Sequence, residues 1–382
     1  MRILILDTYY PEALRRIYEG HPGLESQTYA DQSRAVYDFG FARADFLPLN
    51  LNKLGHEAQQ FIVNAGHLQR RWAQENGVRL PEDGVLPNAV KLWKRGYAGI
   101  KRRVGVLATG SALQSETKIV AAQVQAFRPD VIFVCDVAYL PPEFLLQLKK
   151  KARLLVGEMA YPIPKGTDLG AFDLLLSAAP HFVERIRAAG IPSELFRLGF
   201  ESSILQRLGH QDKTAGAVFI GSVSGHHRER IQLLEEVSRK VPLSCWGAGA
   251  DSLPPDSSLR DKVKPPLWGY AMYQQLQRAK IALNIHIDLA ENYAANMRLY
   301  EATGVGTMLV TDAKLNLHEL FEPGKEVVAY RTPEECAELI AHYLEHPVER
   351  EAIASAGQQR TLREHTYYHR MQELVEIIGR RI

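Results

Sequence analysis

The residues with the clearest chemical potential lie between positions 296 and 312, where Arg298 and Glu301 stand three positions apart on a predicted helix that stops at Gly304. Side chains at positions i and i+3 share a helix face, so both groups can point into one pocket. An arginine and the free N–H groups of a helix N-terminus attract phosphate, and a carboxylate accepts hydrogen bonds from sugar hydroxyls. This combination predicts a nucleotide or nucleotide-sugar site. The alternative is an ion pair on a solvated helix face, which is common on protein surfaces.

The elements that must position this stretch are apolar strands alternating with amphipathic helices. The predicted strands cover residues 2–7, 57–63, 131–136, 153–157, 172–177, 193–198, 216–220, 243–246, 281–286, 308–311 and 327–330. Such alternation predicts an α/β protein with parallel sheets and right-handed crossovers. The length of 382 residues suggests two domains. A polar segment at 205–215 is the predicted linker, which gives an N-terminal domain at 1–205, a C-terminal domain at 206–365 and a last segment at 366–382.

Several loops that follow strands in the second half carry polar or aromatic side chains. Ligands of α/β sheets bind outside the carboxyl ends of the strands, so these loops are expected to share one rim. The loop that begins at Gly221 precedes a helix as a phosphate cradle would, although it matches neither the dinucleotide fingerprint nor a Walker loop. A stiff turn with apolar side chains near Trp268 is expected to hold a flat base. The donor-site candidates are Gly221, Ser222, His227, Arg228, Trp268, Asn284, His286, Asn296, Arg298 and Glu301.

The first half places acids at predicted strand ends and a histidine at a predicted helix start. These residues are Asp7, Asp136, Glu158 and His181. Each is a candidate to bind or activate an acceptor hydroxyl, so Glu158, Asp136 and His181 are the predicted catalytic residues. The alternative for each is a helix cap or a buried hydrogen-bonded group. No metal ligands are predicted, because the three cysteines lie far apart and suit no zinc spacing.

Composition limits the classes of partner. The net charge of +2 gives no global field for nucleic acid or membrane, and hydrophobic residues at 46% with charged residues at 24% are typical of a globular protein. No apolar run approaches the roughly 20 residues of a spanning helix. The unpatterned cysteines and the initial strand lead us to expect a cytoplasmic protein. Six cations between positions 91 and 103 form either a solvated face or a contact with an anionic acceptor or a membrane surface.

The motifs taken together resemble the GT-B glycosyltransferases, specifically the CgeB-like (spore maturation protein, group 1) branch, over nearly the whole chain. The segments that carry the resemblance are Asn296-x-Arg298-x-Tyr300-Glu301-Ala302, Leu309-Val310-Thr311-Asp312, Glu319-Leu320-Phe321, His365-Thr366-Tyr367, Leu54-Gly55-His56-Glu57-Ala58 and Arg128-Pro129-Asp130-Val131. The resemblance implies two Rossmann-like domains with parallel sheets that face each other across a cleft. It also implies a last helix that crosses back to the first domain.

The resemblance further implies sugar transfer from a nucleotide-diphosphate donor, of UDP or dTDP type, to a glycan, protein or small-molecule acceptor. It implies no metal or other cofactor, and retention at the anomeric carbon. Glu301 matches the glutamate that binds the donor ribose, and Arg228 and Arg298 suit the diphosphate. Related retaining enzymes often carry a second glutamate eight positions earlier, where this chain has Tyr293. The alternatives are a nucleotide-sugar epimerase, a phosphorylase, or a non-catalytic sugar-binding or spore-surface protein.

Overall fold

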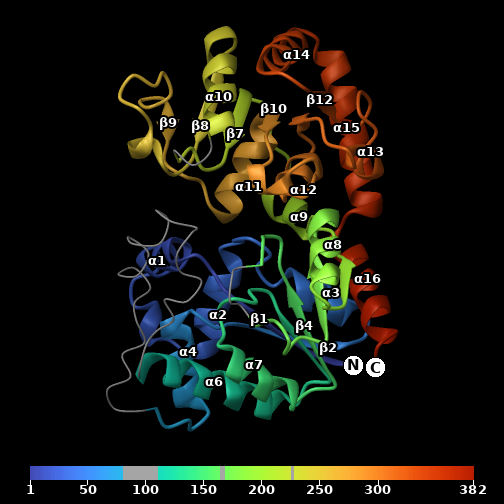
Figure 1. Cartoon of the computed structure of the whole chain (residues 1–382). Helices are drawn as coiled ribbons and strands as arrows, with labels where there is room; N and C mark the ends of the chain where they lie inside the picture. The colour runs from blue at the N-terminus through green and yellow to red at the C-terminus, as the bar shows by residue number, and fades with distance from the viewer. Residues whose placement is uncertain (81–110, 164–167, 225–227) are drawn as a thin grey trace. The chain divides into compact units, whose positions relative to one another are not determined.

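The chain folds into two compact units in the computed structural model, which describes residues 1–80, 111–163, 168–224 and 228–382 (Figure 1). Unit 1 comprises Met1–Phe196 with Met371–Ile382, and unit 2 comprises Arg197–Arg370. The predicted basic segment and the candidate His227 lie outside the described residues. No helix in the described ranges is both long enough and apolar enough to cross a membrane.

Within the described residues, unit 1 is built on a six-stranded sheet in the order β2-β1-β3-β4-β5-β6, with parallel pairings throughout. The strands are β1 (Arg2–Asp7), β2 (Glu57–Ile62), β3 (Val131–Val134), β4 (Leu154–Glu158), β5 (Leu174–Ser177) and β6 (Ser193–Leu195). The first, third, fourth and fifth of these are continuous apolar runs, because helices cover both faces of a parallel sheet. The strand prediction is confirmed here to within a few residues.

Unit 1 contains more helices than the sequence predicted. The described helices are α1 (Pro11–Glu19), α2 (Tyr29–Asp38), α3 (Phe46–Lys53), α4 (Gly66–Glu75), α6 (Ser111–Phe127), α7 (Pro142–Lys149) and α8 (Pro180–Ala188). Helices α1 and α2 were not predicted, although Pro11 at the first position of α1 and Thr28 at the cap of α2 are ordinary start signals. Helices α4, α6 and α7 supply the main core on one face of the sheet, around Phe61 and Trp72.

Unit 2 contains a second parallel sheet, six-stranded in the described part of the chain, in the order β12-β11-β10-β7-β8-β9. Its strands are β7 (Ala215–Ile220), β8 (Leu243–Trp246), β9 (Val263–Lys264), β10 (Ala279–Asn284), β11 (Met308–Asp312) and β12 (Val328–Tyr330). Counted from the first strand of the unit, this is the order 3-2-1-4-5-6 of Rossmann dinucleotide-binding domains. Strands are therefore added to one side of β7 up to β9 and to the other side from β10 onward, so the strand order reverses between the neighbouring parallel strands β7 and β10.

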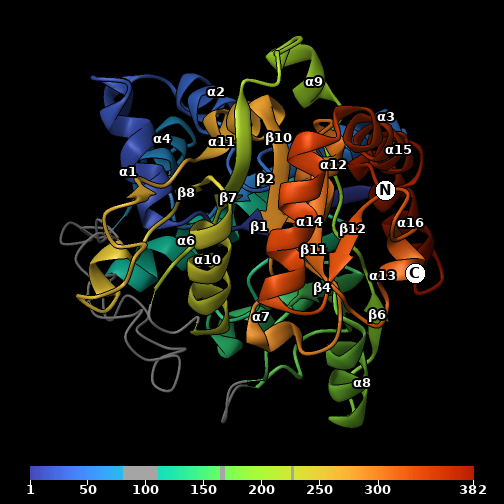
Figure 2. The same cartoon turned by 90° about the horizontal axis from the view of Figure 1, so that it is seen from above.

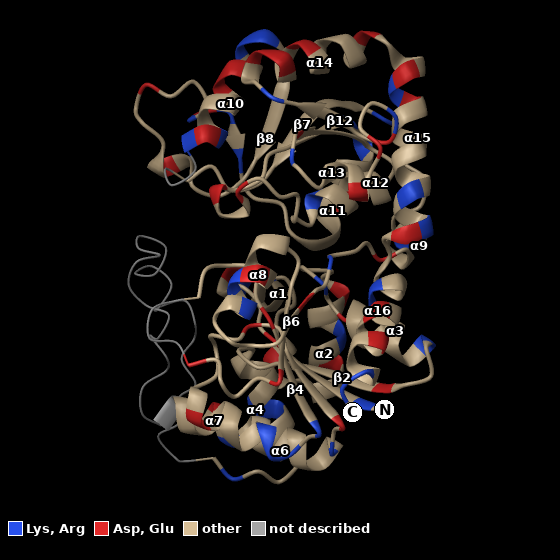
Figure 3. Cartoon of the chain, turned by 45° about the vertical axis from the view of Figure 1, so that its right-hand side comes forward, with Lys and Arg blue, Asp and Glu red and all other residues tan. Residues whose placement is uncertain are grey.

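The helices of unit 2 cover both faces of its sheet. They are α9 (Ser203–Leu208), α10 (Arg228–Lys240), α11 (Gly269–Arg278), α12 (Arg298–Gly304), α13 (Leu317–Leu320), α14 (Pro333–Glu345) and α15 (Pro347–Glu364). Helices α10 and α14 pack side by side on one face, and α11 and α12 pack together on the other (Figure 2). Strands β7, β8 and β12 contain no charged residue, whereas α10, α14 and α15 carry many (Figure 3). The core therefore lies between the sheet and the apolar faces of these helices.

Within the polar segment predicted as a linker, residues 209–214 lie in neither a helix nor a strand, between the end of α9 at Leu208 and the start of β7 at Ala215. The last helix, α16 (Tyr367–Gly379), starts in unit 2 and continues in unit 1. Beyond it, the guanidinium of Arg381 donates to Glu194 at 2.8 Å within unit 1.

Candidate active site

The point where the strand order of unit 2 reverses, between β7 and β10, locates the candidate site. Parallel strands end at the same edge, so the loops after β7 and β10 leave the sheet side by side and in opposite directions. In open α/β sheets this is the position where ligands bind. The loop after β7 begins at Gly221, and the segment after β10 runs through His286 to the start of α12 at Arg298. The predicted donor-site residues of these two loops therefore lie at one point of one edge.

The loop after β7 is held by the loop after β8. The Gly221 amide donates to the Trp246 carbonyl at 2.9 Å, and the Val223 amide donates to the Ala248 carbonyl at 2.8 Å. A side chain at Gly247 would place its Cβ 1.9 Å from the Gly221 carbonyl oxygen, so only glycine fits there. The backbones of the loops after β7 and β8 therefore approach each other closely at this glycine.

Two arginines at the start of α10 have different environments. Arg228 is exposed, whereas the Arg230 side chain is buried and donates to the Ser222 carbonyl at 2.9 Å and the Ile285 carbonyl at 3.3 Å. Burial lowers the pKa of Arg230, and nearby carboxylates, Asp288 first among them, oppose this change. Arg230 therefore links the loops after β7 and β10. Arg230 was not among the predicted site residues, although it lies on the apolar face of α10, where its spacing from the buried leucines was a usable signal.

Arg298 and Glu301 form a buried ion pair. Arg298 Nη1 lies 2.8 Å from Glu301 Oε2, and their side chains are only 15% and 8% exposed. Arg298 also donates to the Ile220 carbonyl at 3.1 Å, at the carboxyl end of β7, and contacts the Met272 sulfur on α11. Burial raises the pKa of Glu301, while the charge of Arg298 acts in the opposite direction. The solvated surface pair considered as an alternative is therefore wrong, because the structure buries both groups.

Asn284 and Asn296 hold the two ends of the segment that joins β10 to α12. The Asn296 amide donates to Asn284 Oδ1 at 2.9 Å, and the Asn284 amide donates to Thr311 Oγ1 at 2.9 Å. The Tyr330 hydroxyl donates to the Asn284 carbonyl at 2.9 Å. Asn284 thus ties three neighbouring strands together at their carboxyl ends, and its side chain is occupied by protein partners.

His286 and Asp312 form a buried pair at the same edge. His286 Nδ1 lies 2.7 Å from Asp312 Oδ1, and Lys314 Nζ lies 3.1 Å from Asp312 Oδ2. Burial would raise the pKa of Asp312, but its bonds to His286 and Lys314 outweigh burial and lower it. Among the described residues, His286 Nε2 has no hydrogen-bond partner. Asp312 therefore orients the imidazole and leaves one buried ring nitrogen for a ligand.

The remaining donor-site candidates occupy the rim. Ser222 is partly exposed, and its hydroxyl accepts from the Ser224 amide at 3.3 Å. Trp268 is half-buried. It directly precedes α11 and follows the edge strand β9. Both residues follow carboxyl ends of strands in the sheet of unit 2, on the same edge as Arg298.

The predicted catalytic acids come together at the corresponding edge of unit 1. Glu158 ends β4 and forms a buried ion pair with Arg43, with side chains 10% and 12% exposed. Asp136 follows the adjacent strand β3 and accepts from the Thr8 hydroxyl at 3.3 Å. Burial raises the pKa of Asp136, whose hydrogen bonds to Ala138 and Thr8 act against this rise. Glu158 is thus neutralised by an arginine, and Asp136 is the more available acid.

Arg43 was not predicted, and no local signal identified it. Its neighbours Ala42 and Ala44 both have left-handed backbone conformations, with φ of 51° and 42°. Such conformations cost about 1–2 kcal/mol for a non-glycine residue. The tertiary structure holds this strained turn, in part through the Gln60 side-chain amide, which donates to the Ala44 carbonyl at 2.7 Å. His181 lies apart from these acids in the chain, buried in the first turn of α8 after β5.

Comparison with known proteins supports a glycosyltransferase-like chain. Residues 228–376 match the family model described as glycosyl transferase-like. No curated protein sequence matches the chain. The structure resembles that of HepE from Anabaena in complex with UDP-glucose, with a TM-score of 0.56, 14% identity and 100% of each chain covered.

Two further solved structures have the same fold. Sucrose-phosphate synthase from Thermosynechococcus elongatus has a TM-score of 0.55 and 12% identity, with 100% of this chain and 98% of that chain covered. A glycosyltransferase from Rickettsia africae has a TM-score of 0.56 and 11% identity, with 99% and 97% covered. The chain has the GT-B fold, with two Rossmann-like α/β units. The predicted fold class is confirmed in this respect.

Proposed function

We propose that the protein is a glycosyltransferase that moves a sugar from a nucleotide-diphosphate donor to an acceptor hydroxyl. The observation that carries the proposal is the buried Arg298–Glu301 pair, anchored to the end of β7 where the sheet of unit 2 reverses. The matched family region, 228–376, includes this pair. We further propose that the chain belongs to the CgeB-like branch, on the motifs around this pair.

The donor is proposed to bind at the carboxyl edge of the sheet in unit 2. Glu301 would accept hydrogen bonds from ribose hydroxyls, and Arg298 with Arg228 would contact the diphosphate. A buried carboxylate with a cation at 2.8 Å is already oriented, so little reorganisation is needed on binding. HepE, which shares the fold, was solved in complex with UDP-glucose, and we propose a donor of UDP or dTDP type on that basis.

The arginines are proposed to replace a metal ion in the chemistry. The bond between the anomeric carbon and the diphosphate oxygen breaks, and negative charge develops on the leaving diphosphate. Fixed cations at that point lower the barrier without a divalent ion. We propose that transfer retains the configuration of the anomeric carbon, because the chain resembles retaining enzymes. Tyr293 would then replace the second glutamate of those enzymes near the sugar.

The acceptor is proposed to bind in unit 1 near Asp136. The residue is partly exposed, and burial of its carboxylate raises the pKa, which suits a group that accepts a hydrogen bond or a proton from a hydroxyl. Glu158 would act through Arg43, because the two neutralise each other. His181 remains a candidate for acceptor contact on α8.

A nucleotide screen followed by a transfer assay tests the proposal. Thermal shift with UDP, GDP, ADP, CMP and dTDP should show the largest rise in melting temperature with UDP or dTDP. The preferred nucleotide, supplied with labelled sugars, should then give free nucleoside diphosphate and labelled acceptor. Interconversion of the sugar on the nucleotide would indicate an epimerase. No shift with any nucleotide would indicate that the fold serves a non-catalytic role.

A further inference from the structure

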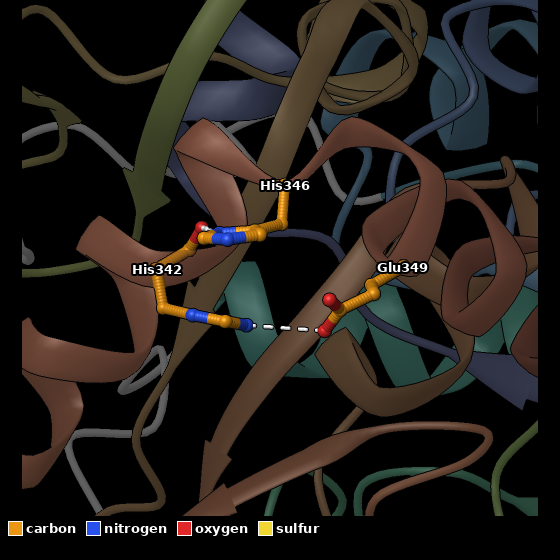
Figure 4. A group of neighbouring side chains, drawn as sticks. All are labelled: His342, His346 and Glu349. Atoms are coloured by element: carbon orange, nitrogen blue, oxygen red, sulfur yellow. Dashed lines mark hydrogen bonds and ion pairs between the residues drawn. The ribbon is translucent and has the colours of Figure 1, made fainter.

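Two histidines and a glutamate gather where α14 meets α15, on a part of unit 2 that the proposed chemistry does not use. His342 lies in the last turn of α14, His346 joins the two helices, and Glu349 lies in the first turn of α15 (Figure 4). One nitrogen from each ring and one carboxylate oxygen lie within 4.8 Å of one another. The cluster is exposed, so water and ions reach it freely.

The spacing of these atoms is close to that required by a tetrahedral metal ion. Zinc binds imidazole nitrogen and carboxylate oxygen at about 2.0–2.2 Å, so neighbouring ligand atoms lie about 3.3 Å apart. His342 Nε2 and Glu349 Oε2 are already 3.1 Å apart. The third ligand atom, from His346, lies within 4.8 Å of both.

The tautomer of His346 is set by the backbone. Its Nδ1 lies 2.7 Å from the His342 carbonyl oxygen, and a carbonyl only accepts, so Nδ1 carries the proton. The lone pair of the neutral ring is therefore on Nε2. A hydrogen bond from the second ring nitrogen is the usual support of a metal-bound histidine. The two imidazoles stack with centroids 4.0 Å apart and planes 17° apart.

The corner that carries the three side chains is rigid. The buried guanidinium of Arg350 donates to the Tyr343 carbonyl at 2.8 Å and to the Leu344 carbonyl at 3.3 Å, which joins the end of α14 to the start of α15. Sites on fixed helices keep their ligands near binding geometry, which reduces the entropy lost on binding.

We propose that His342, His346 and Glu349 bind a divalent transition-metal ion that favours imidazole, with Zn²⁺ as the reference ion. Water completes the coordination. The corner lies at the amino edge of the sheet, because Leu344 is the neighbour of Gly216 at the start of β7. The proposed donor site lies at the carboxyl edge. The ion would therefore clamp α14 to α15 and take no part in sugar transfer.

Calorimetric titration of the full chain with ZnCl₂ tests this site. Wild type should bind one more Zn²⁺ per chain than His342→Ala/His346→Ala, and Glu349→Gln should weaken that site about tenfold or more. The matched control is His210→Ala/His318→Ala, which removes two exposed histidines elsewhere and should titrate as wild type. All these side chains are exposed, so the variants should fold.

Melting temperature provides the second measurement. Zn²⁺ should raise it in wild type and in the control, and this rise should be smaller in His342→Ala/His346→Ala. Equal stoichiometry and equal affinity in wild type and that variant would overturn the proposal. So would loss of the site in the control.

Discussion

Glu301→Gln is the substitution that separates a donor-binding role from a structural one. The change keeps the shape of the side chain and one acceptor oxygen, but it removes the charge. In the structure Glu301 is the buried partner of Arg298, which also contacts the Ile220 carbonyl and the Met272 sulfur. Loss of the charge therefore leaves a guanidinium that is only 15% exposed without an anion.

The expected loss of folding stability follows from this burial. Removal of one partner from a buried ion pair costs about 3–5 kcal/mol, and the amide oxygen of Gln recovers about 1 kcal/mol as a neutral hydrogen bond. We therefore expect the free energy of unfolding to fall by at most about 2–4 kcal/mol, because the raised pKa of Glu301 means that burial already disfavours its charged form. For the solvated surface pair that was the alternative, the fold would be nearly unaffected.

The expected loss of nucleotide affinity is independent of that figure. A hydrogen bond from a ribose hydroxyl to a carboxylate is worth about 1.5–3 kcal/mol, against about 1 kcal/mol for a neutral acceptor. The dissociation constant of UDP should therefore rise about tenfold or more, because about 1.4 kcal/mol corresponds to one decade.

The assay combines urea unfolding with calorimetry of UDP binding at a temperature where both proteins are folded. Glu158→Gln is the matched control, since it also removes the anion of a buried pair, with Arg43, but in unit 1. It should lose comparable stability and keep the UDP affinity of wild type. If Glu301→Gln loses stability but binds UDP as tightly as wild type, Glu301 is structural and the donor-site assignment is refuted.

Three further predictions concern the arginines of α10, the metal dependence of transfer and the pH dependence of stability. Arg228→Ala should weaken UDP binding about tenfold and keep the free energy of unfolding within about 0.5 kcal/mol of wild type, because the residue is exposed. Wild-type UDP affinity in Arg228→Ala would remove that residue from the site. Arg230→Ala should weaken UDP binding and also destabilise the fold. Sugar transfer should persist in excess EDTA, whereas loss of activity with rescue by Mn²⁺ would contradict the metal-independent proposal. Burial raises the pKa of Glu116 to about 7, against a weaker effect of Tyr139, so the folded chain holds a proton that the unfolded chain releases above about pH 4.5. The free energy of unfolding should then fall by at most about 1.4 kcal/mol per unit as pH rises from 4.5 to 7, and Glu116→Gln should lack this slope in urea unfolding at several pH values.

Local sequence patterns predicted helices and strands correctly where the residues of the element themselves carry the signal. The apolar runs of β1 and β10 indicated buried strands, because residues packed on both faces must be apolar along their length. Strand β9 was missed, since it has two residues and no pattern can identify a strand that short. Helices α1 and α2 were missed although their start signals, Pro11 and Thr28, were present in the sequence.

The residues of the candidate site also divide into those that local spacing predicted and those that only tertiary contacts bring into place. The spacing of Arg298 and Glu301 predicted that they share one helix face, because helix geometry alone brings positions i and i+3 together. Their burial depends on the end of β7 and on Met272 in α11, which no local pattern reports. Arg43 is the extreme case, because the partner of Glu158 lies 115 positions away in the chain and sits in a turn that only tertiary contacts hold.

The sequence by itself determined the alternation of strands and helices, the parallel sheets and the chemical types that follow each strand, since these depend on neighbours within a few residues. The tertiary structure decided which strands lie side by side. The pairing of β7 with β10 sets the reversal point of unit 2, and it arises because the chain crosses back over its first strand after β9. That order is fixed by packing across the whole sheet, and it brings Arg230, Arg298 and His286 to one edge.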